Sequence, residues 1–215
     1  MMSTTKFRRF SFLFVLPTPK GKSVRRMEMF EHVKGFIGNI ALLQKSEAMM
    51  KKTTMDFQQD GLGFWVDSRP DFNLGCVVLK ESEMLLANEV MNEVCTRLNE
   101  ANWEEKHHID MFCIASFILE SKNDIFSSFI RKDAWDKLFK KEENYKPRRL
   151  EIWQPPSKDK IRRGFTIATG KKGNMIEFTL SNMFENAFPI DAVSKAMSAV
   201  NETKKTYLMK LIGRE

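Results

Sequence analysis

The sequence predicts an α+β fold, in which a small and mostly antiparallel sheet carries helices packed on one face. Three features predict it: short segments with apolar residues at every second position, longer segments with apolar residues three and four apart, and a glycine-bounded turn between two apolar runs. The chain has 215 residues, of which 42% are hydrophobic, so it can bury a core without disulfides or metals. We expect a basic arm with a Phe-rich strand in residues 1–26 and a single α+β domain in residues 27–215.

The strands are predicted from alternation and from turns. Phe10, Phe12 and Phe14 alternate as on one face of a strand, which Pro17 ends. The turn Gly-Lys-Lys-Gly at residues 170–173 joins two apolar runs and gives the clearest hairpin signal in the chain. A further apolar stretch, residues 109–119, is expected to be buried, but its pattern fits both a strand and a helix. The predicted sheet comprises residues 10–16, 74–80, 150–153, 165–169 and 175–180.

The helices are predicted from apolar stripes. Residues 24–51 show helical spacing, although Gly35 and Gly38 each cost about 1 kcal/mol relative to alanine. Residues 84–98 predict an amphipathic helix that Ser82 can cap. Residues 53–73 are rich in turn formers and predict a surface loop with a short strand at residues 64–66. Further helices are expected over residues 124–138 and after Pro189, the latter with a stripe of Ile190, Val193, Met197 and Val200.

The cysteines indicate a reducing compartment. Cys76, Cys95 and Cys113 are odd in number and widely spaced, whereas secreted domains of this size carry patterned pairs. We therefore expect three buried thiols in an intracellular protein. The longest apolar runs fall short of the roughly 18 residues that cross a bilayer. The N-terminal basic residues and the run after them imitate a signal peptide, but the run is short, ends at Pro17 and lacks a cleavage site.

The net charge of +7 is concentrated in two segments. Residues 1–26 hold seven basic residues and no acidic one, and residues 146–172 hold nine basic and two acidic residues, which leaves the rest of the chain at −7. Such segments attract polyanions or anionic lipid, unless they pair with the acidic remainder within the fold. The predicted anion-binding residues are Lys6, Arg8, Arg9, Lys20, Lys22, Arg25, Arg26, Lys146, Arg148, Arg149, Lys158, Lys160, Arg162, Arg163, Lys171 and Lys172.

The sequence shows no motif of catalysis or of metal binding. His107 and His108 are adjacent, and the cysteines lie far from them, so the ligand spacing of a zinc site is missing. The run from Gly164 to Lys172 has five residues between its glycines, where a phosphate-binding loop needs four, and a lysine where that loop has Ser or Thr. We expect a non-enzymatic protein with no metal and no cofactor.

Four aromatic residues lie among the basic ones: Phe7, Phe10, Trp153 and Phe165. Such rings can stack on nucleic-acid bases, enter a lipid interface, or fill the core. The sequence leaves these three uses open.

One stretch of the chain reads Ile161-Arg162-Arg163-Gly164-Phe165-Thr166-Ile167, then Lys172-Gly173, then Ile176-Glu177-Phe178-Thr179. It resembles the late hairpin of rhabdovirus matrix proteins. In the vesiculovirus members an apolar residue and two arginines precede a Phe-x-Ile strand, and a Lys-Gly turn, an Ile-Glu-x-Thr strand and a helix follow. The Phe-rich strand after a basic arm is also similar in outline, and the resemblance covers about a quarter of the chain. The Pro-Pro-x-Tyr budding motif of the family is missing near the N-terminus.

The resemblance implies a structural protein without enzymatic activity that condenses the nucleocapsid, binds the inner leaflet of the envelope and self-associates. The expected partners are therefore an anionic lipid surface, the nucleocapsid or RNA, and further copies of the chain, at the inner membrane face and in the virion. Two rival hypotheses are left open. An RNA-binding regulatory protein, such as a host-defence suppressor, would bind RNA without preferring liposomes, and an enzyme of unrecognised type would need a pocket with converging titratable groups.

Overall fold

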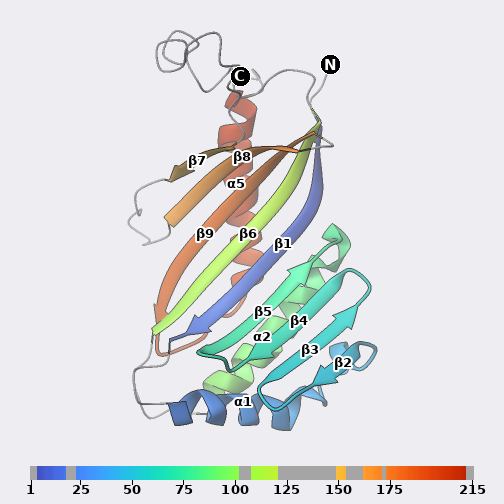
Figure 1. Cartoon of the computed structure of the whole chain (residues 1–215), viewed down its shortest axis with the longest axis vertical. Helices are drawn as coiled ribbons and strands as arrows, with labels where there is room; N and C mark the ends of the chain where they lie inside the picture. The colour runs from blue at the N-terminus through green and yellow to red at the C-terminus, as the bar shows by residue number, and fades with distance from the viewer. Residues whose placement is uncertain are drawn as a thin grey trace, which may run out of the picture.

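The computed structural model describes residues 4–17, 23–101, 108–120, 149–153, 162–170 and 173–211. These residues form one nine-stranded sheet and three α-helices, so the predicted α+β class is confirmed (Figure 1). The strand order is β2-β3-β4-β5-β1-β6-β9-β8-β7, and every pairing is antiparallel. The strands are β1 (Thr4–Leu16), β2 (Glu47–Met50), β3 (Thr54–Gln59), β4 (Leu62–Asp67), β5 (Phe72–Val78), β6 (His108–Glu120), β7 (Arg149–Trp153), β8 (Arg162–Gly170) and β9 (Gly173–Glu185), and the helices are α1 (Ser23–Ile37), α2 (Met84–Glu100) and α5 (Ala192–Leu211), with 3-10 turns η1 (Ala41–Leu43) and η2 (Glu81–Glu83).

The expectation of a small sheet is wrong, because residues 47–67 form three strands, whereas a helix end and a loop with one short strand were predicted there. The predicted short strand at residues 64–66 is confirmed and lies in β4. The first helix ends at Ile37, next to Gly38, and the chain then turns into β2. Strands β3 and β4 are joined by Asp60 and Gly61, a two-residue loop in which the φ angle of Gly61 is 85°. That positive φ suits glycine and fits the tight turn of a hairpin. The undecided stretch at residues 109–119 lies in strand β6.

The apolar stripes predicted for the remaining helices are confirmed in part. Ala87, Met91, Val94 and Leu98 of α2 are buried, as predicted. Ser82 does not cap this helix, because its hydroxyl donates to the carboxylate of Glu83 instead. Helix α5 begins at Ala192, so Ile190 lies before it and is exposed, while Val193, Met197 and Val200 are buried. The helix predicted at residues 124–138 lies outside the described residues.

Helices α2 and α5 lie against one face of the sheet, and α1 crosses its lower end (Figure 1). Most of the strand residues that point toward these helices are buried, and β1 supplies the centre of the core with Phe10, Phe12 and Phe14. The rings of Phe12 and Phe14 meet edge to face with their centroids 4.9 Å apart. Burying each such side chain stabilises the fold by roughly 1.5–3 kcal/mol. Strand β1 pairs with β5 on one side and β6 on the other, so the N-terminal strand belongs to the middle of the sheet.

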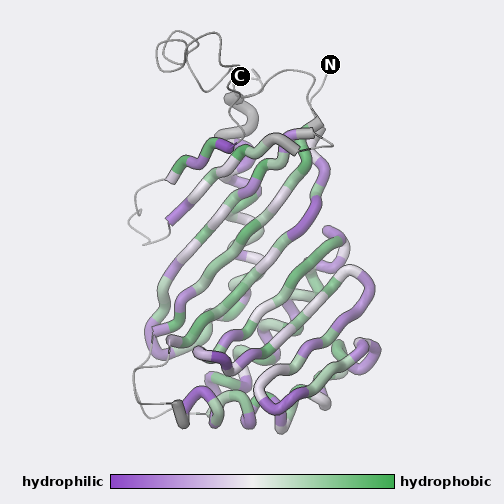
Figure 2. Tube along the Cα trace, in the orientation of Figure 1, coloured by the Kyte–Doolittle hydropathy of each residue, from purple (hydrophilic) through white to green (hydrophobic). Residues whose placement is uncertain are grey.

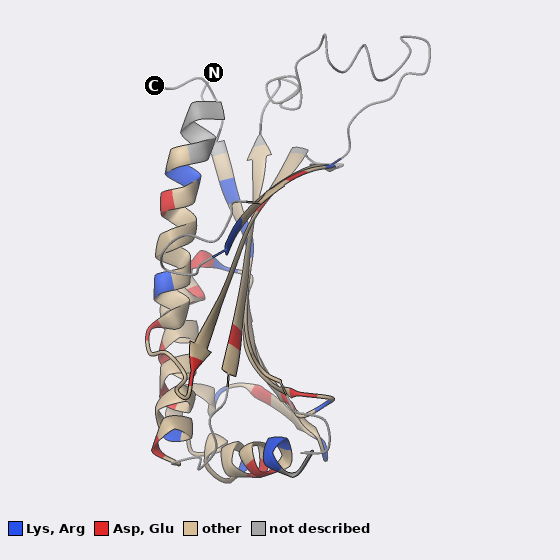
Figure 3. Cartoon of the chain, turned by 90° about the vertical axis from the view of Figure 1, so that its left-hand side faces the viewer, with Lys and Arg blue, Asp and Glu red and all other residues tan. Residues whose placement is uncertain are grey.

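The opposite face of the sheet carries no helix that the structure describes, and we call it the bare face. Viewed nearly edge-on in Figure 3, the sheet curves away from α5, so the bare face is concave in that view. Figure 2 shows that the central strands are largely hydrophobic, whereas the upper half of β1 is hydrophilic. The chemistry of the bare face therefore changes along the strands.

Candidate anion-binding face

Eight of the sixteen predicted anion-binding residues lie in the part of the chain that the structure describes. The other eight, Lys20, Lys22, Lys146, Arg148, Lys158, Lys160, Lys171 and Lys172, fall outside the described residues. The described ones are Lys6, Arg8 and Arg9 on β1, Arg149 on β7, Arg162 and Arg163 on β8, and Arg25 and Arg26 on α1.

Strand pairing brings the two basic segments onto one face. Lys6 pairs with Ile118, Ile118 with Met175, Met175 with Ala168, and Ala168 with Arg149, which makes one row across five strands. Paired residues of antiparallel strands point to the same side of a sheet. The next residues along these strands belong to the core or pack against it: Phe117, Ile176 and Ile167 are buried, and Phe7 and Leu150 are partly buried. The row therefore lies on the bare face. With strands about 4.8 Å apart, Lys6 and Arg149 stand about 19 Å from each other.

A β-bulge adds two arginines to the same face. The pairing of β1 with β6 shifts between Phe7 and Arg9, so Arg8 is the extra residue. Arg9 pairs with Ser116, which lies on the bare face. The Nη1 atom of Arg8 lies 2.8 Å from the Sδ atom of Met175, which is on that face too. A bulge re-aims side chains in this manner, and here it lets two consecutive residues point the same way.

We call Lys6, Arg8 and Arg9 the β1 cluster. All three are exposed, and no ion pair joins any of them to another described residue. In Figure 3 the basic residues of the strands gather in the upper part of the sheet. Charges that lack an internal partner keep their full attraction for an external anion. Within the described part of the chain, the fold therefore does not neutralise these three residues.

Two carboxylates share the upper part of the bare face. Glu177 accepts a hydrogen bond from the Ser116 hydroxyl at 3.1 Å. Glu151 lies 3.3 Å from Arg149 and pairs with it, so Arg149 is partly neutralised. Among the side chains that the structure describes in this half of the bare face, five are cations, with Arg162 as the fifth, against these two anions. A net positive field therefore covers this half of the sheet.

Three predicted cations lie elsewhere. Arg163 pairs with Leu180 on the helix side of the sheet and is half-buried. Arg25 and Arg26 are half-buried on α1, at the opposite end of the molecule (Figure 1). The guanidinium of Arg26 donates to the carbonyl oxygen of Pro70, so it fixes the loop before β5. Charge counting found these residues but could not tell which side of an element they occupy.

The aromatic residues divide in the same way. Phe10 and Phe165 are buried in the core, and Phe7 packs against Phe117. Trp153 is on the bare face and 50% exposed. Two residues that sequence reasoning missed, Phe112 and Ile114, also point outward from β6 with 43% and 41% exposure. No sequence signal could have found them, because the outward residues in the middle of β6 are as apolar as the buried ones.

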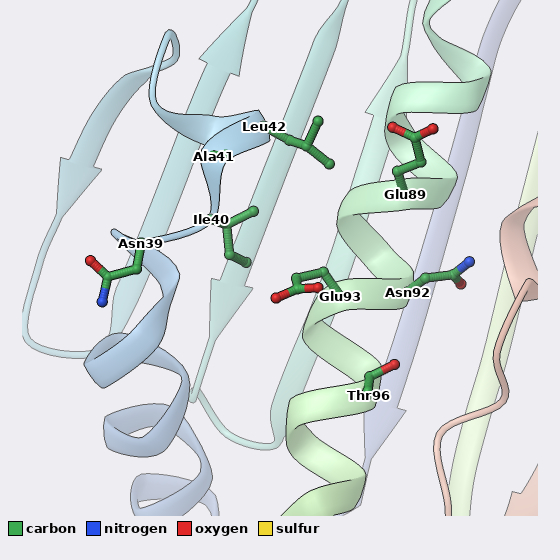
Figure 4. Close-up of a pocket in the computed structure, with 8 residues that line it drawn as sticks. All are labelled: Asn39, Ile40, Ala41, Leu42, Glu89, Asn92, Glu93 and Thr96. Atoms are coloured by element: carbon green, nitrogen blue, oxygen red, sulfur yellow. The ribbon is translucent and has the colours of Figure 1, made fainter.

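A second surface feature lies between α2 and the segment after α1. It is a hollow of about 520 Å³ lined by Asn39, Ile40, Ala41, Leu42, Glu89, Asn92, Glu93 and Thr96 (Figure 4). Glu89 and Glu93 make it acidic, and Glu93 is paired with Arg97 at 2.6 Å. An anion would be repelled there. Within the described residues, no three His, Cys, Asp or Glu side chains come together as a metal site would require.

The expected buried thiols are confirmed, because Cys76, Cys95 and Cys113 are free and buried. Burial raises the pKa of the Cys76 thiol to about 12 and raises those of Cys95 and Cys113 as well. Since the thiolate is the reactive form, we expect no reaction with Ellman's reagent over minutes in the folded protein, and reaction of all three thiols in guanidinium. Rapid reaction of one thiol in the native protein would contradict this placement.

The fold and this face together define a class of protein: a large antiparallel sheet with helices on one side and a cluster of basic residues on the other, three of which have no ion pair with another described residue. Neither a protein-family model nor a curated protein matches the sequence, so the resemblance to rhabdovirus matrix proteins stays a prediction. Among the helices that the structure describes, none has the length and apolar character to cross a bilayer.

Proposed function

We propose that this protein is a non-enzymatic structural protein of the matrix type, which binds the RNA of a nucleocapsid with the basic half of its bare face. The observation that carries the proposal is the meeting of two distant basic segments on one side of the sheet. Lys6, Arg8 and Arg9 come from the first segment, and Arg149 and Arg162 from the second. Phosphate contacts by such residues supply most of the affinity of sequence-independent nucleic-acid binding.

The curvature of the sheet supports RNA as the first partner. A concave face can follow a strand of RNA, whereas a bilayer is flat on this scale (Figure 3). Anionic lipid is the second candidate, supported by the exposed side chains of Phe112 and Ile114 beside the cations. Apolar side chains next to Lys and Arg suit a membrane interface. A host-defence suppressor would share the RNA-binding face but would not need copies to associate.

Self-association belongs to the same proposal. Strand β2 forms one end of the strand order, and all four of its residues are exposed. An edge strand presents unpaired backbone groups that can pair with another chain. Met49 and Met50, exposed by 54% and 48%, add apolar surface at that edge. A matrix role would place the assembled protein inside the cell, at the inner membrane face, and in the virion.

The proposal also rests on the residues that resemble the matrix-protein hairpin. Most of them lie in β8 and β9, which pair from Arg162 with Ser181 to Gly170 with Gly173. Arg162, the first of the two arginines, lies on the bare face. The resemblance and the geometry therefore point to one half of the sheet.

Co-sedimentation tests the proposal. The purified protein is spun with anionic liposomes, with neutral liposomes and with RNA, separately and together. With five cations in contact, the affinity for single-stranded RNA should fall roughly 100-fold between about 50 and 200 mM salt. Binding to anionic liposomes alone would replace RNA by lipid as the partner. Binding to neither at low salt would overturn the proposal.

A further inference from the structure

The indole of Trp153 lies flat on the sheet. A Cβ atom placed on Gly164, its partner across the β7–β8 pairing, would stand 3.0 Å from Cε3, 3.0 Å from Cζ3 and 3.1 Å from Cη2 of that indole. Three consecutive ring atoms can be equally far from one point only if the point lies over the face of the ring. Because Gly164 has no side chain, the indole ring can lie directly against the backbone of β8. One ring face contacts the sheet, and the other face is turned to solvent, in accord with the 50% exposure.

Hydrogen bonds hold the ring in this position. The Nε1–H group of Trp153 donates to Oε1 of Glu151 at 2.6 Å, and Nη2 of Arg149 donates to Oε2 of the same carboxylate at 3.3 Å. These three residues alternate along β7 and share the bare face. An exposed ring that is already ordered loses little conformational entropy when a flat ligand stacks on it.

A cation stands next to the ring. Arg162 precedes Gly164 by two residues on β8, so its side chain emerges on the same face, diagonal to Trp153. It is exposed, and no ion pair with another described residue holds it. A flat π surface beside a guanidinium that no described carboxylate pairs suits a single-stranded nucleic acid, because each nucleotide presents a planar base and a phosphate.

We propose that Trp153 is a base-stacking site for single-stranded RNA and that Arg162 binds a phosphate of the stacked nucleotide. This inference rests on the proposed function and names the form of RNA that the bare face takes. In a duplex the base faces are covered by neighbouring bases, so only an unpaired base can lie on the indole. The ring lies along the surface and its Nε1–H group is held by Glu151, so it does not stand out as a membrane anchor would.

Fluorescence anisotropy with labelled oligouridine and with a labelled RNA duplex of the same length tests the site. Trp153→Leu should weaken oligouridine binding about 10-fold and leave duplex binding within 2-fold, because stacking on one aromatic contributes about this factor. Trp153→Phe should keep most of the affinity. Arg162→Ala should lower the slope of log affinity against log salt by about 0.7, whereas Trp153→Leu should leave that slope unchanged.

Trp65→Leu is the matched control. Trp65 also lies over a glycine, Gly75, on the bare face, but Asp56 pairs with it and Asp67 follows two residues later. RNA should avoid these acidic surroundings, so Trp65→Leu should bind oligouridine as tightly as the wild type does. Two outcomes would overturn the stacking site and leave the proposed function standing. One is an equal loss of RNA affinity in both Trp variants, and the other is no loss of affinity in Trp153→Leu while RNA binding stays dependent on charge. Loss of liposome binding alone in Trp153→Leu would overturn it in favour of lipid.

Discussion

Replacing Lys6, Arg8 and Arg9 together by glutamate is expected to lower the affinity for single-stranded RNA roughly 100-fold at low salt, because each lost charged contact costs about 1 kcal/mol. The three side chains are exposed and lack ion-pair partners among the described residues, so the fold does not depend on their charge. The slope of log affinity against log salt should also shrink by about two, since each phosphate contact to a single strand contributes about 0.7. A binding titration at several salt concentrations measures both quantities.

A second triple variant controls for net charge. Lys45, Lys51 and Lys52 are exposed on either side of β2, at the other end of the sheet, and their replacement by glutamate changes the net charge by the same amount. If RNA binding depends on the β1 cluster, this control should lose at most a few-fold in affinity. Similar losses in both variants would mean that the whole-protein charge, and not the bare face, attracts RNA. Circular dichroism should be the same for both variants and the wild type.

The sequence predicted six of the nine strands at least in part, namely the five of the predicted sheet and the short strand at residues 64–66, for physical reasons that the structure makes clear. In β1 only one face is buried, so the alternation of its phenylalanines is visible. In β6 the outward residues Phe112 and Ile114 are as apolar as the buried ones, and the period of two disappears. Strand β3 was missed and only residues 64–66 of β4 were predicted, because turn formers lie between and around these two strands, although Asp60-Gly61 is itself a hairpin signal.

The site was predictable in composition but not in geometry. Counting charges located the basic segments, yet it could not separate Arg162 on the bare face from Arg163 on the helix side. Parity along a strand would place Arg8 and Arg9 on opposite faces, and only the bulge puts both on one. The contact between Trp153 and Gly164 was equally unpredictable, because the two residues meet through the pairing of β7 with β8. Cross-strand register is a tertiary property, and hydrophobic patterns fix it only after the neighbours of each strand are known.

Replacing Gly75 by alanine is expected to destabilise the protein by about 3 kcal/mol, the upper part of the usual range for overpacking. The added methyl group would overlap the Trp65 indole and stand 2.8 Å from the backbone carbonyl oxygen of Phe12. The indole can tilt away, but the Phe12 carbonyl belongs to the β1–β5 pairing in the centre of the sheet and cannot move without weakening it. Urea unfolding followed by circular dichroism gives the change in the free energy of unfolding.

Two comparisons separate the backbone overlap from the ring overlap. Gly35→Ala, in α1 where nothing lies within 4 Å of the added atom, should stabilise the protein by up to about 1 kcal/mol, because alanine is the better helix former. In Gly164→Ala, the three atoms nearest to the added methyl group all belong to the exposed ring of Trp153. The substitution should therefore cost less than about 1 kcal/mol of stability, but it should displace the ring from the sheet and weaken RNA stacking. A small effect of Gly75→Ala would show that β1 and β5 can separate without loss of stability. The expected contrast assigns different roles to two similar glycines: Gly75 lets the central strands approach, and Gly164 positions a ring.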